Sequence, residues 1–176
     1  SACVKDNREE NEERLRRSLK YYRERVSRPD GYPEEIFYSQ YRIGTIMRAM
    51  EEPWNLTHTE LLKAYNMDPL RGEPIKAIID YYLNMGDWNL AYLYTSFAKK
   101  VFHGHSPYPK KLLFVDESLY IWKFLEAHSA ACFYTGRKDE AKQTFQEMVK
   151  VSQENPSYFT PQDYQKIQQN SQFFLN

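Results

Sequence analysis

Apolar residues recur at spacings of three and four along almost the whole chain, and no segment shows a sustained alternation of apolar and polar residues. A spacing of three to four places apolar side chains on one face of an α-helix, whereas a β-strand needs a period of two. The clearest stripe is Leu15, Leu19, Tyr22 and Val26, where acidic residues come first and basic residues follow, as the helix dipole favours. The pattern predicts an all-α protein with no sheet.

Glycine and proline divide the chain into about eight helices, since both residues interrupt helical periodicity and Pro favours the first helical turn. The expected helices cover about residues 9–26, 34–50, 57–66, 73–85, 88–101, 118–134, 139–153 and 160–174. Residues 102–117 contain several turn-forming residues and are expected to form a long loop. We expect residues 1–8 to be a disordered tail and residues 9–176 to be a single domain.

Two glycine turns are followed by the same pattern of packing residues. Ala91 lies five positions after Gly86, Ala141 lies five positions after Gly136, and the position twelve after each glycine is again a packing residue. This is the spacing of the helix-turn-helix repeat of about 34 residues. The two glycines are 50 residues apart because the 102–117 loop is inserted between them. The predicted fold is an irregular, right-handed, tetratricopeptide-like array of about eight helices, whose last helix caps an exposed apolar face.

Short segments spread in order over about residues 20–150 are similar to a known helical region. They are Phe37–Gly44, Leu62–Tyr65, Arg71–Pro74, Tyr81–Tyr82, Leu90–Leu93, Pro107–Pro109, Leu113–Asp116, Tyr120–Lys123 and Tyr134–Arg137. Together they resemble the tetratricopeptide-like region that follows the catalytic domain in bacterial and viral family-2-type glycosyltransferases. The resemblance implies an accessory region of such a transferase. The chain begins at Ser1 without a methionine, so we expect a processed protein or a fragment whose catalytic domain lies on the N-terminal side.

The residues provide no catalytic motif. The Asp-x-Asp pair that such transferases use to hold a metal is absent, as are a glycine-rich phosphate loop and a His-Glu-x-x-His pattern. His128 and Cys132 share a helix face and offer a base and a thiol, but the repeat register makes both of them packing residues. We interpret His103 and His105 as loop residues rather than metal ligands. We expect no catalytic residue, no metal site and no cofactor, and whether the chain is an enzyme stays open.

Charge and composition narrow the possible partners. The chain has 24 Lys and Arg against 24 Asp and Glu, so its net charge gives no reason to bind nucleic acid. No stretch approaches the ~20 apolar residues that span a bilayer, so no membrane insertion is expected. Cys3 and Cys132 lie far apart and are interpreted as free thiols of a protein in the reducing cytoplasm.

A binding surface is the function that remains. In a right-handed stack of helix pairs, residues of each first helix that face away from the packing positions line a concave groove. These candidate groove residues are Tyr38, Tyr41, Thr45, Arg48, Glu73, Lys76, Asp80, Lys123 and Glu126. Tyr and Arg can stack on a sugar ring or hold a peptide, so the expected partner is a protein, a peptide or a glycan acceptor. A free-standing adaptor for a peptide or protein is the alternative, and an enzyme acting through His128 or Cys132 ranks third.

Overall fold

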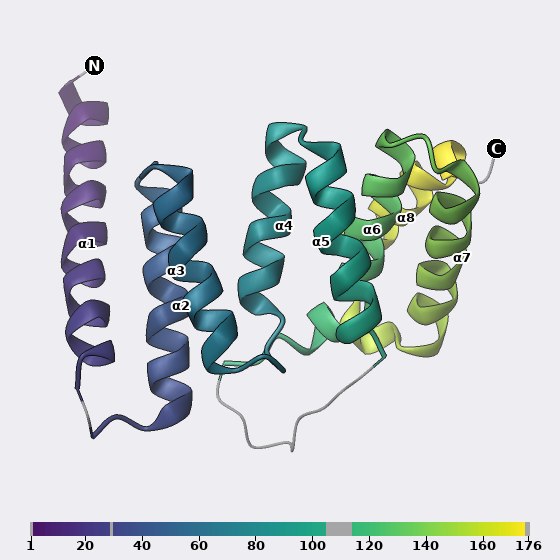
Figure 1. The fold of residues 1–176 in the computed structure, drawn as a ribbon. Coiled ribbons are helices and arrows are strands. Elements are labelled where there is room, and N and C mark those ends of the chain that lie inside the picture. Colours follow the sequence, from purple (N-terminus) through teal and green to yellow (C-terminus); the bar gives the residue numbers. More distant parts are fainter. Residues whose placement is uncertain (1, 29, 105–113, 175–176) are drawn as a thin grey trace. The chain divides into compact units, whose positions relative to one another are not determined.

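The computed structural model describes residues 2–28, 30–104 and 114–174, and all regular structure within these ranges is helical (Figure 1). The α-helices are α1 (Ala2–Val26), α2 (Pro33–Ala49), α3 (Trp54–Met67), α4 (Glu73–Met85), α5 (Trp88–Val101), α6 (Phe124–Tyr134), α7 (Lys138–Glu154) and α8 (Pro161–Phe174). A π-helical turn, η1 (Leu119–Lys123), leads into α6, and a 3-10 turn, η2 (Pro156–Tyr158), precedes α8. The prediction of an all-α helical array is confirmed.

Helix α1 begins at Ala2, where the sequence analysis expected a disordered tail over residues 1–8. Extending an existing helix adds one backbone hydrogen bond for each residue that becomes ordered, so a helix that is stable from Glu9 onward grows toward the N-terminus at little cost. Of the long loop expected at 102–117, residues 105–113 lie outside the described part of the chain. No described helix has an apolar stretch long enough to cross a membrane.

Contacts divide the chain into two compact units, whereas the sequence analysis expected a single domain over residues 9–176. Among the described residues, the first unit runs to Pro74 and includes Phe114, and the second holds the rest of the chain from Ile75 onward. In a helical array each helix contacts mainly its neighbours in the sequence, so few long-range contacts tie distant hairpins together. A division between hairpins follows from this pattern.

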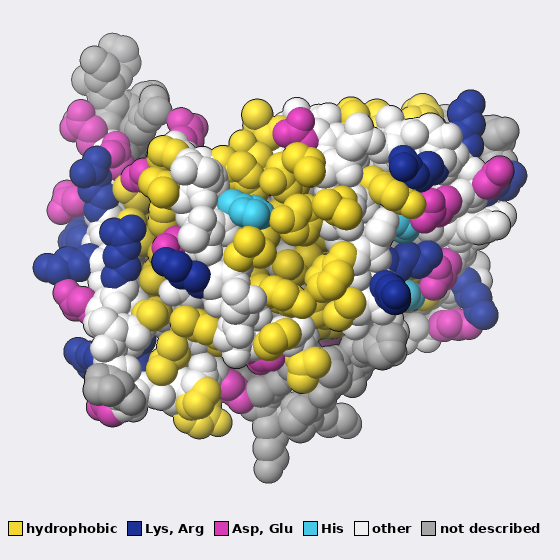
Figure 2. Space-filling model, viewed as in Figure 1, with side chains coloured by type: hydrophobic (Ala, Val, Ile, Leu, Met, Phe, Trp, Pro, Cys, Tyr) yellow, Lys and Arg dark blue, Asp and Glu magenta, His cyan; other side chains and the backbone are white. Residues whose placement is uncertain are grey.

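In the first unit α1 packs on α2, and α2 packs on α3. Its core contains Leu19 from α1 with Ile43, Ile46 and Met47 from α2, and the predicted α1 stripe lies against it. The outer face of α1 carries interleaved basic and acidic side chains, as Figure 2 shows. The apolar stripe of α1 is therefore a packing face, and its charged face is exposed to solvent.

Three helical hairpins end their first helix with the same backbone turn. A residue with positive φ closes each of α2, α4 and α6: Glu51 (57°), Gly86 (74°) and Gly136 (77°). The next amide then donates to the carbonyl five residues back: Glu52 to Met47 (3.0 Å), Asp87 to Tyr82 (2.9 Å) and Arg137 to Cys132 (2.9 Å). This bond is that of the Schellman motif, and it satisfies a carbonyl that the helix end leaves open. The turns predicted at Gly86 and Gly136 are confirmed, and Glu51 forms an equivalent turn without glycine.

Each second helix of these hairpins carries a buried triplet spaced by four and three residues. The triplets are Thr57, Leu61 and Ala64 in α3, Ala91, Thr95 and Ala98 in α5, and Ala141, Phe145 and Met148 in α7, all at most 2% exposed. The same positions of each second helix therefore face the neighbouring helices. The register that the sequence predicted after Gly86 and Gly136 is present in the structure.

Helix α8 covers the last hairpin of the second unit. The Phe174 ring stacks on Phe145 of α7 with a centroid distance of 4.6 Å. Ile167 of α8 also packs against the cluster that contains Trp122 and Phe159. Because α8 has no buried residue of its own, it contributes one partly buried stripe and exposes the rest. This is the capping arrangement expected for the last helix.

Candidate functional site

The predicted groove residues belong to both units and are described unit by unit. In the first unit, the Tyr38 ring stacks on Phe114 at a centroid distance of 4.2 Å and meets Tyr22 edge-on at 6.4 Å. The Tyr41 ring is tilted against Tyr38 at 6.4 Å, and the Thr45 hydroxyl donates to the backbone carbonyl of Arg42 at 3.1 Å. These α2 tyrosines are half-buried among other rings, so much of their apolar surface serves packing.

Glu73 does not lie on an open surface, in contrast to its predicted place in the groove. It is 6% exposed, and Arg71 beside it is 1% exposed. The Arg71 Nη2 donates to Glu73 Oε1 at 2.8 Å, and the guanidinium carbon lies 4.6 Å from the centre of the Phe37 ring. Arg71 also donates to the carbonyl of Phe114 at 3.2 Å. This ion pair turns Glu73 inward, which the repeat register alone did not indicate.

In the second unit the predicted groove residues are charged side chains that have partners of opposite sign. Lys76 pairs with Asp80 at 2.5 Å along α4. Lys123 pairs with Asp116 at 2.6 Å, and Glu126 pairs with Lys166 of α8 at 2.7 Å. Burial raises the pKa of Asp116, but hydrogen bonds from Lys123 and Ser118 outweigh it and hold that pKa below its usual range. The surface therefore carries both signs in fixed positions.

Helix α5 carries a second surface feature, an exposed apolar stripe. Leu90, Leu93 and Phe97 follow one another at helical spacing and are 42%, 61% and 38% exposed. Figure 2 shows hydrophobic side chains gathered on the part of this face that α4 and α5 occupy. All three side chains are therefore partly accessible to solvent.

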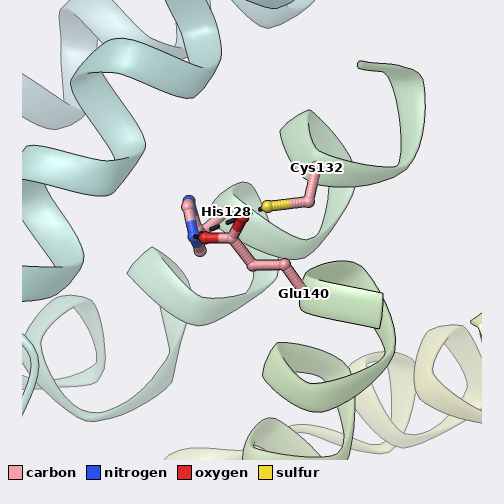
Figure 3. Close-up of side chains that lie close together, drawn as sticks. All are labelled: His128, Cys132 and Glu140. Carbon is pink, nitrogen blue, oxygen red and sulfur yellow. Dashed lines mark hydrogen bonds and ion pairs between the residues drawn. The ribbon is translucent and has the colours of Figure 1, made fainter. Parts of the chain in front are cut away.

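A buried polar cluster of His128, Cys132 and Glu140 lies where α6 meets α7 (Figure 3). Helix α6 supplies His128 and Cys132 one turn apart, and α7 supplies Glu140 from its first turn. The His128 Nε2 lies 2.9 Å from Glu140 Oε1 and 3.5 Å from the Cys132 Sγ. His128 and Cys132 are 2% and 0% exposed, whereas the Glu140 side chain is 42% exposed. One edge of the polar cluster therefore reaches solvent.

Residues of α5 and of the α6–α7 turn surround the polar cluster. The Thr95 Oγ1 lies 3.0 Å from His128 Nδ1, and the Tyr92 hydroxyl donates to Glu140 Oε2 at 3.1 Å. The Tyr92 ring stacks on the His128 ring at 5.5 Å, and the Arg137 guanidinium carbon lies 3.8 Å from the centre of the Tyr92 ring. The imidazole and the carboxylate are each held by a second residue.

Burial sets the protonation of the polar cluster. It lowers the pKa of His128 below its usual value, although the Glu140 carboxylate opposes this, so the imidazole is neutral at pH 7. Burial, together with the nearby Glu140 charge, raises the pKa of the Cys132 thiol to about 12. Burial raises the pKa of Glu140, but hydrogen bonds from His128 and Tyr92 outweigh this effect and hold that pKa below its usual range. A protonated thiol is a poor nucleophile, so this geometry does not form an activated Cys–His pair.

The sequence analysis treated His128 and Cys132 as packing residues, and their burial agrees with that. It missed Glu140, the third member of the polar cluster. Its place in the repeat could have identified it. Glu140 immediately precedes Ala141, a packing position of the repeat, so it lies at the start of α7 where that helix meets α6. A carboxylate at that position lies close to His128 and Cys132 of α6.

Comparisons with known proteins return no match for this chain among protein families, curated proteins or solved structures. The tetratricopeptide-like assignment and the likeness to the glycosyltransferase-associated region therefore stay predictions.

Proposed function

We propose that this chain is a non-catalytic, tetratricopeptide-like module that binds a protein partner or a glycan acceptor through the polar faces of its first helices. The observation that carries the proposal is the repetition of one hairpin, with the same turn and the same buried triplet, in α2–α3, α4–α5 and α6–α7. Stacked hairpins of this kind use their second helices for packing and leave one face of each first helix for ligands. The alternative is a free-standing adaptor for a peptide or protein.

The second unit offers the best-defined part of such a surface. Lys76 and Asp80 on α4, and Lys123 and Glu126 at the start of the α6 hairpin, are each held by an ion pair. Their side chains are between 23% and 39% exposed, so they are partly immobilised yet reachable. Donors and acceptors held in place lose less entropy on binding than free side chains do. A surface of both signs suits a partner that carries donors and acceptors, such as a peptide backbone or sugar hydroxyls.

The protonation of the polar cluster favours a binding role over an enzymatic one. The thiol of Cys132 is protonated and fully buried, and His128 is 2% exposed. A substrate has no direct contact with either group in this arrangement. Because Cys132 is a free thiol, we also assign the module to a reducing compartment, the cytoplasm.

The proposed attachment to a glycosyltransferase is supported by the ordered sequence resemblance together with the absence of an Asp-x-Asp pair from this chain. Sequencing the parent gene tests it directly. A reading frame that encodes a nucleotide-sugar-binding domain upstream of Ser1 is the expected result. A reading frame that encodes no such domain would contradict the attachment to a glycosyltransferase and would favour the free-standing adaptor.

The binding role is tested with the purified chain on two immobilised panels, one of glycans and one of peptides. The variant Lys76→Glu with Lys123→Glu reverses two charges of the proposed surface, and Lys150→Glu reverses an exposed charge of α7 as the matched control. We expect a ligand of the wild type to bind the double variant at least about tenfold more weakly, which is about 1.4 kcal/mol. It should bind Lys150→Glu unchanged. Absence of any ligand on both panels, or equal loss in the control, would contradict the proposal.

A further inference from the structure

We propose that the polar cluster of His128, Cys132 and Glu140 is a binding site for one divalent ion of the zinc class. The ligands are His128 Nε2, Cys132 Sγ and a carboxylate oxygen of Glu140, which lie within 4.8 Å of one another. The ion would link α6 to α7 near the turn that connects them. This site shares no residue with the proposed partner surface.

The donor types select the class of ion. Imidazole nitrogen, thiolate sulfur and carboxylate oxygen together suit Zn²⁺ and its close analogues, whereas Mg²⁺ and Ca²⁺ take oxygen ligands. His128 and Cys132 are four residues apart on α6, so both side chains leave the same face of the helix. Glu140 reaches them from α7, so the three side chains converge from two helices (Figure 3).

Two of the three distances between donors are close to those around a tetrahedral ion, and all three lie within 4.8 Å. Zinc bond lengths of about 2.0–2.1 Å to N or O and about 2.3 Å to S place the N and O donors roughly 3.3 Å apart and the N and S donors roughly 3.6 Å apart. In the structure the Nε2–Oε1 distance is 2.9 Å and the Nε2–Sγ distance is 3.5 Å. An outward shift of a few tenths of an ångström at the partly exposed Glu140 side chain brings the Nε2–Oε1 distance to the tetrahedral value.

The surrounding hydrogen bonds orient the imidazole for a ligand at Nε2. The Thr95 hydroxyl lies 3.2 Å from the Tyr92 carbonyl, to which it donates, so its oxygen is left to accept the Nδ1–H of His128 at 3.0 Å. This tautomer has a lone pair on Nε2 that an ion can accept. Without an ion, the other tautomer lets Nε2–H donate to Glu140 at 2.9 Å, and a bound ion replaces that hydrogen bond. The contacts of Thr95 with His128 and of Tyr92 with Glu140 match those that usually orient metal-bound His and carboxylate groups.

Charge and access are also compatible with an ion. A divalent ion with one thiolate and one carboxylate is electrically neutral, which reduces the cost of placing charge beside two buried side chains. The Glu140 side chain is 42% exposed, so an ion can enter from that edge. Three protein ligands leave a fourth position, which water can occupy at the same edge.

The test is a titration of the chelator-treated full chain with Co²⁺, a spectroscopic substitute for Zn²⁺. We expect a thiolate-to-cobalt charge-transfer band that saturates at one equivalent and disappears when Zn²⁺ is added. The band should be lost in Cys132→Ser and kept in Cys3→Ser, which removes the other cysteine of the sequence. Thr95→Val, which removes the hydrogen bond to Nδ1, should weaken binding about 10- to 100-fold.

A second variant, Glu140→Gln, removes a ligand at a partly exposed side chain, so this variant is expected to fold even if substitutions of the buried ligands do not. Zn²⁺ should raise the melting temperature of the wild type and of Cys3→Ser, but shift Glu140→Gln little. The proposal is overturned if folded wild-type protein gives no charge-transfer band at millimolar Co²⁺, or if Cys132→Ser keeps the band. In that case the cluster is a hydrogen-bonded one in which Nε2–H donates to Glu140.

Discussion

Adding one methyl group at Gly44 should loosen the contact between α2 and α3. A Cβ built on Gly44 would lie 2.6 Å from Leu61 Cδ2, 2.7 Å from Leu61 Cγ and 3.3 Å from the Leu61 backbone nitrogen. Leu61 is 0% exposed, so its side chain has no free space to move into. The methyl group can be accommodated only if the two helices separate.

The expected effect of Gly44→Ala is the difference between two terms. Replacing Gly by Ala inside a helix stabilises it by up to about 1 kcal/mol. Overpacking a filled core costs about 1–3 kcal/mol, and the two contacts below 3.0 Å with the Leu61 side chain place this site at the upper end. We expect Gly44→Ala to lower the free energy of unfolding by about 2 kcal/mol.

Urea unfolding followed by tryptophan fluorescence measures this change, because Trp54 begins α3. The control is a double-mutant cycle with Leu61→Ala, which removes Leu61 Cγ and Cδ2, the two nearest atoms. In that background Gly44→Ala should be neutral or stabilising by up to about 1 kcal/mol. A Gly44→Ala variant as stable as the wild type, or the same cost in both backgrounds, would refute the close approach of the two helices.

Three further predictions concern buried polar groups. Glu73→Ala should lower the free energy of unfolding by about 3–5 kcal/mol in urea, because it leaves the Arg71 guanidinium buried without this carboxylate; a loss below about 1 kcal/mol would contradict the buried pair. The pKa of His128 is lowered below the value near 6.5 that it has in the unfolded chain, so the unfolded state binds the proton first and stability should fall as pH drops below about 6.5. In His128→Gln the urea midpoint should change less between pH 7 and pH 5 than it does in the wild type, and an equal change in both proteins would exclude His128 as the cause. Burial raises the pKa of Cys132 to about 12, so iodoacetamide should modify it at pH 8 only after denaturation, and rapid labelling in the native state of a Cys3→Ser chain would argue against that burial.

The helices and their register were predictable because they depend on local sequence. Apolar spacing of three and four defines the helix faces, and Gly86 and Gly136 take a backbone conformation that glycine adopts easily. The turn at Glu51 has the same geometry without glycine, so composition gave no signal for it. The start of α1 at Ala2 was missed because the extension of a helix depends on the helix behind it, not on the residues added.

The candidate sites were less predictable because they depend on contacts between helices. Glu73 was placed in the groove by register, but a hydrogen-bonded ion pair with Arg71 draws it into the interior. Glu140 joins His128 only when α7 folds back on α6, and a single sequence does not contain the resulting distance of 2.9 Å. The spacing of residues in the sequence identifies which of them share a helix face. The polar partner of a residue on a neighbouring helix can be identified only from the three-dimensional structure.

The π-helical turn Leu119–Lys123 shifts the helical register just before α6. Such a turn holds one residue more than an α-helical turn, and each α-helical residue corresponds to a rotation of about 100°. Side chains ahead of the turn are therefore rotated by about that angle relative to a regular helix continued backward from Phe124. In this register Leu119, Tyr120 and Trp122 are all buried, so deleting one residue from the turn would swing side chains that now form core toward solvent.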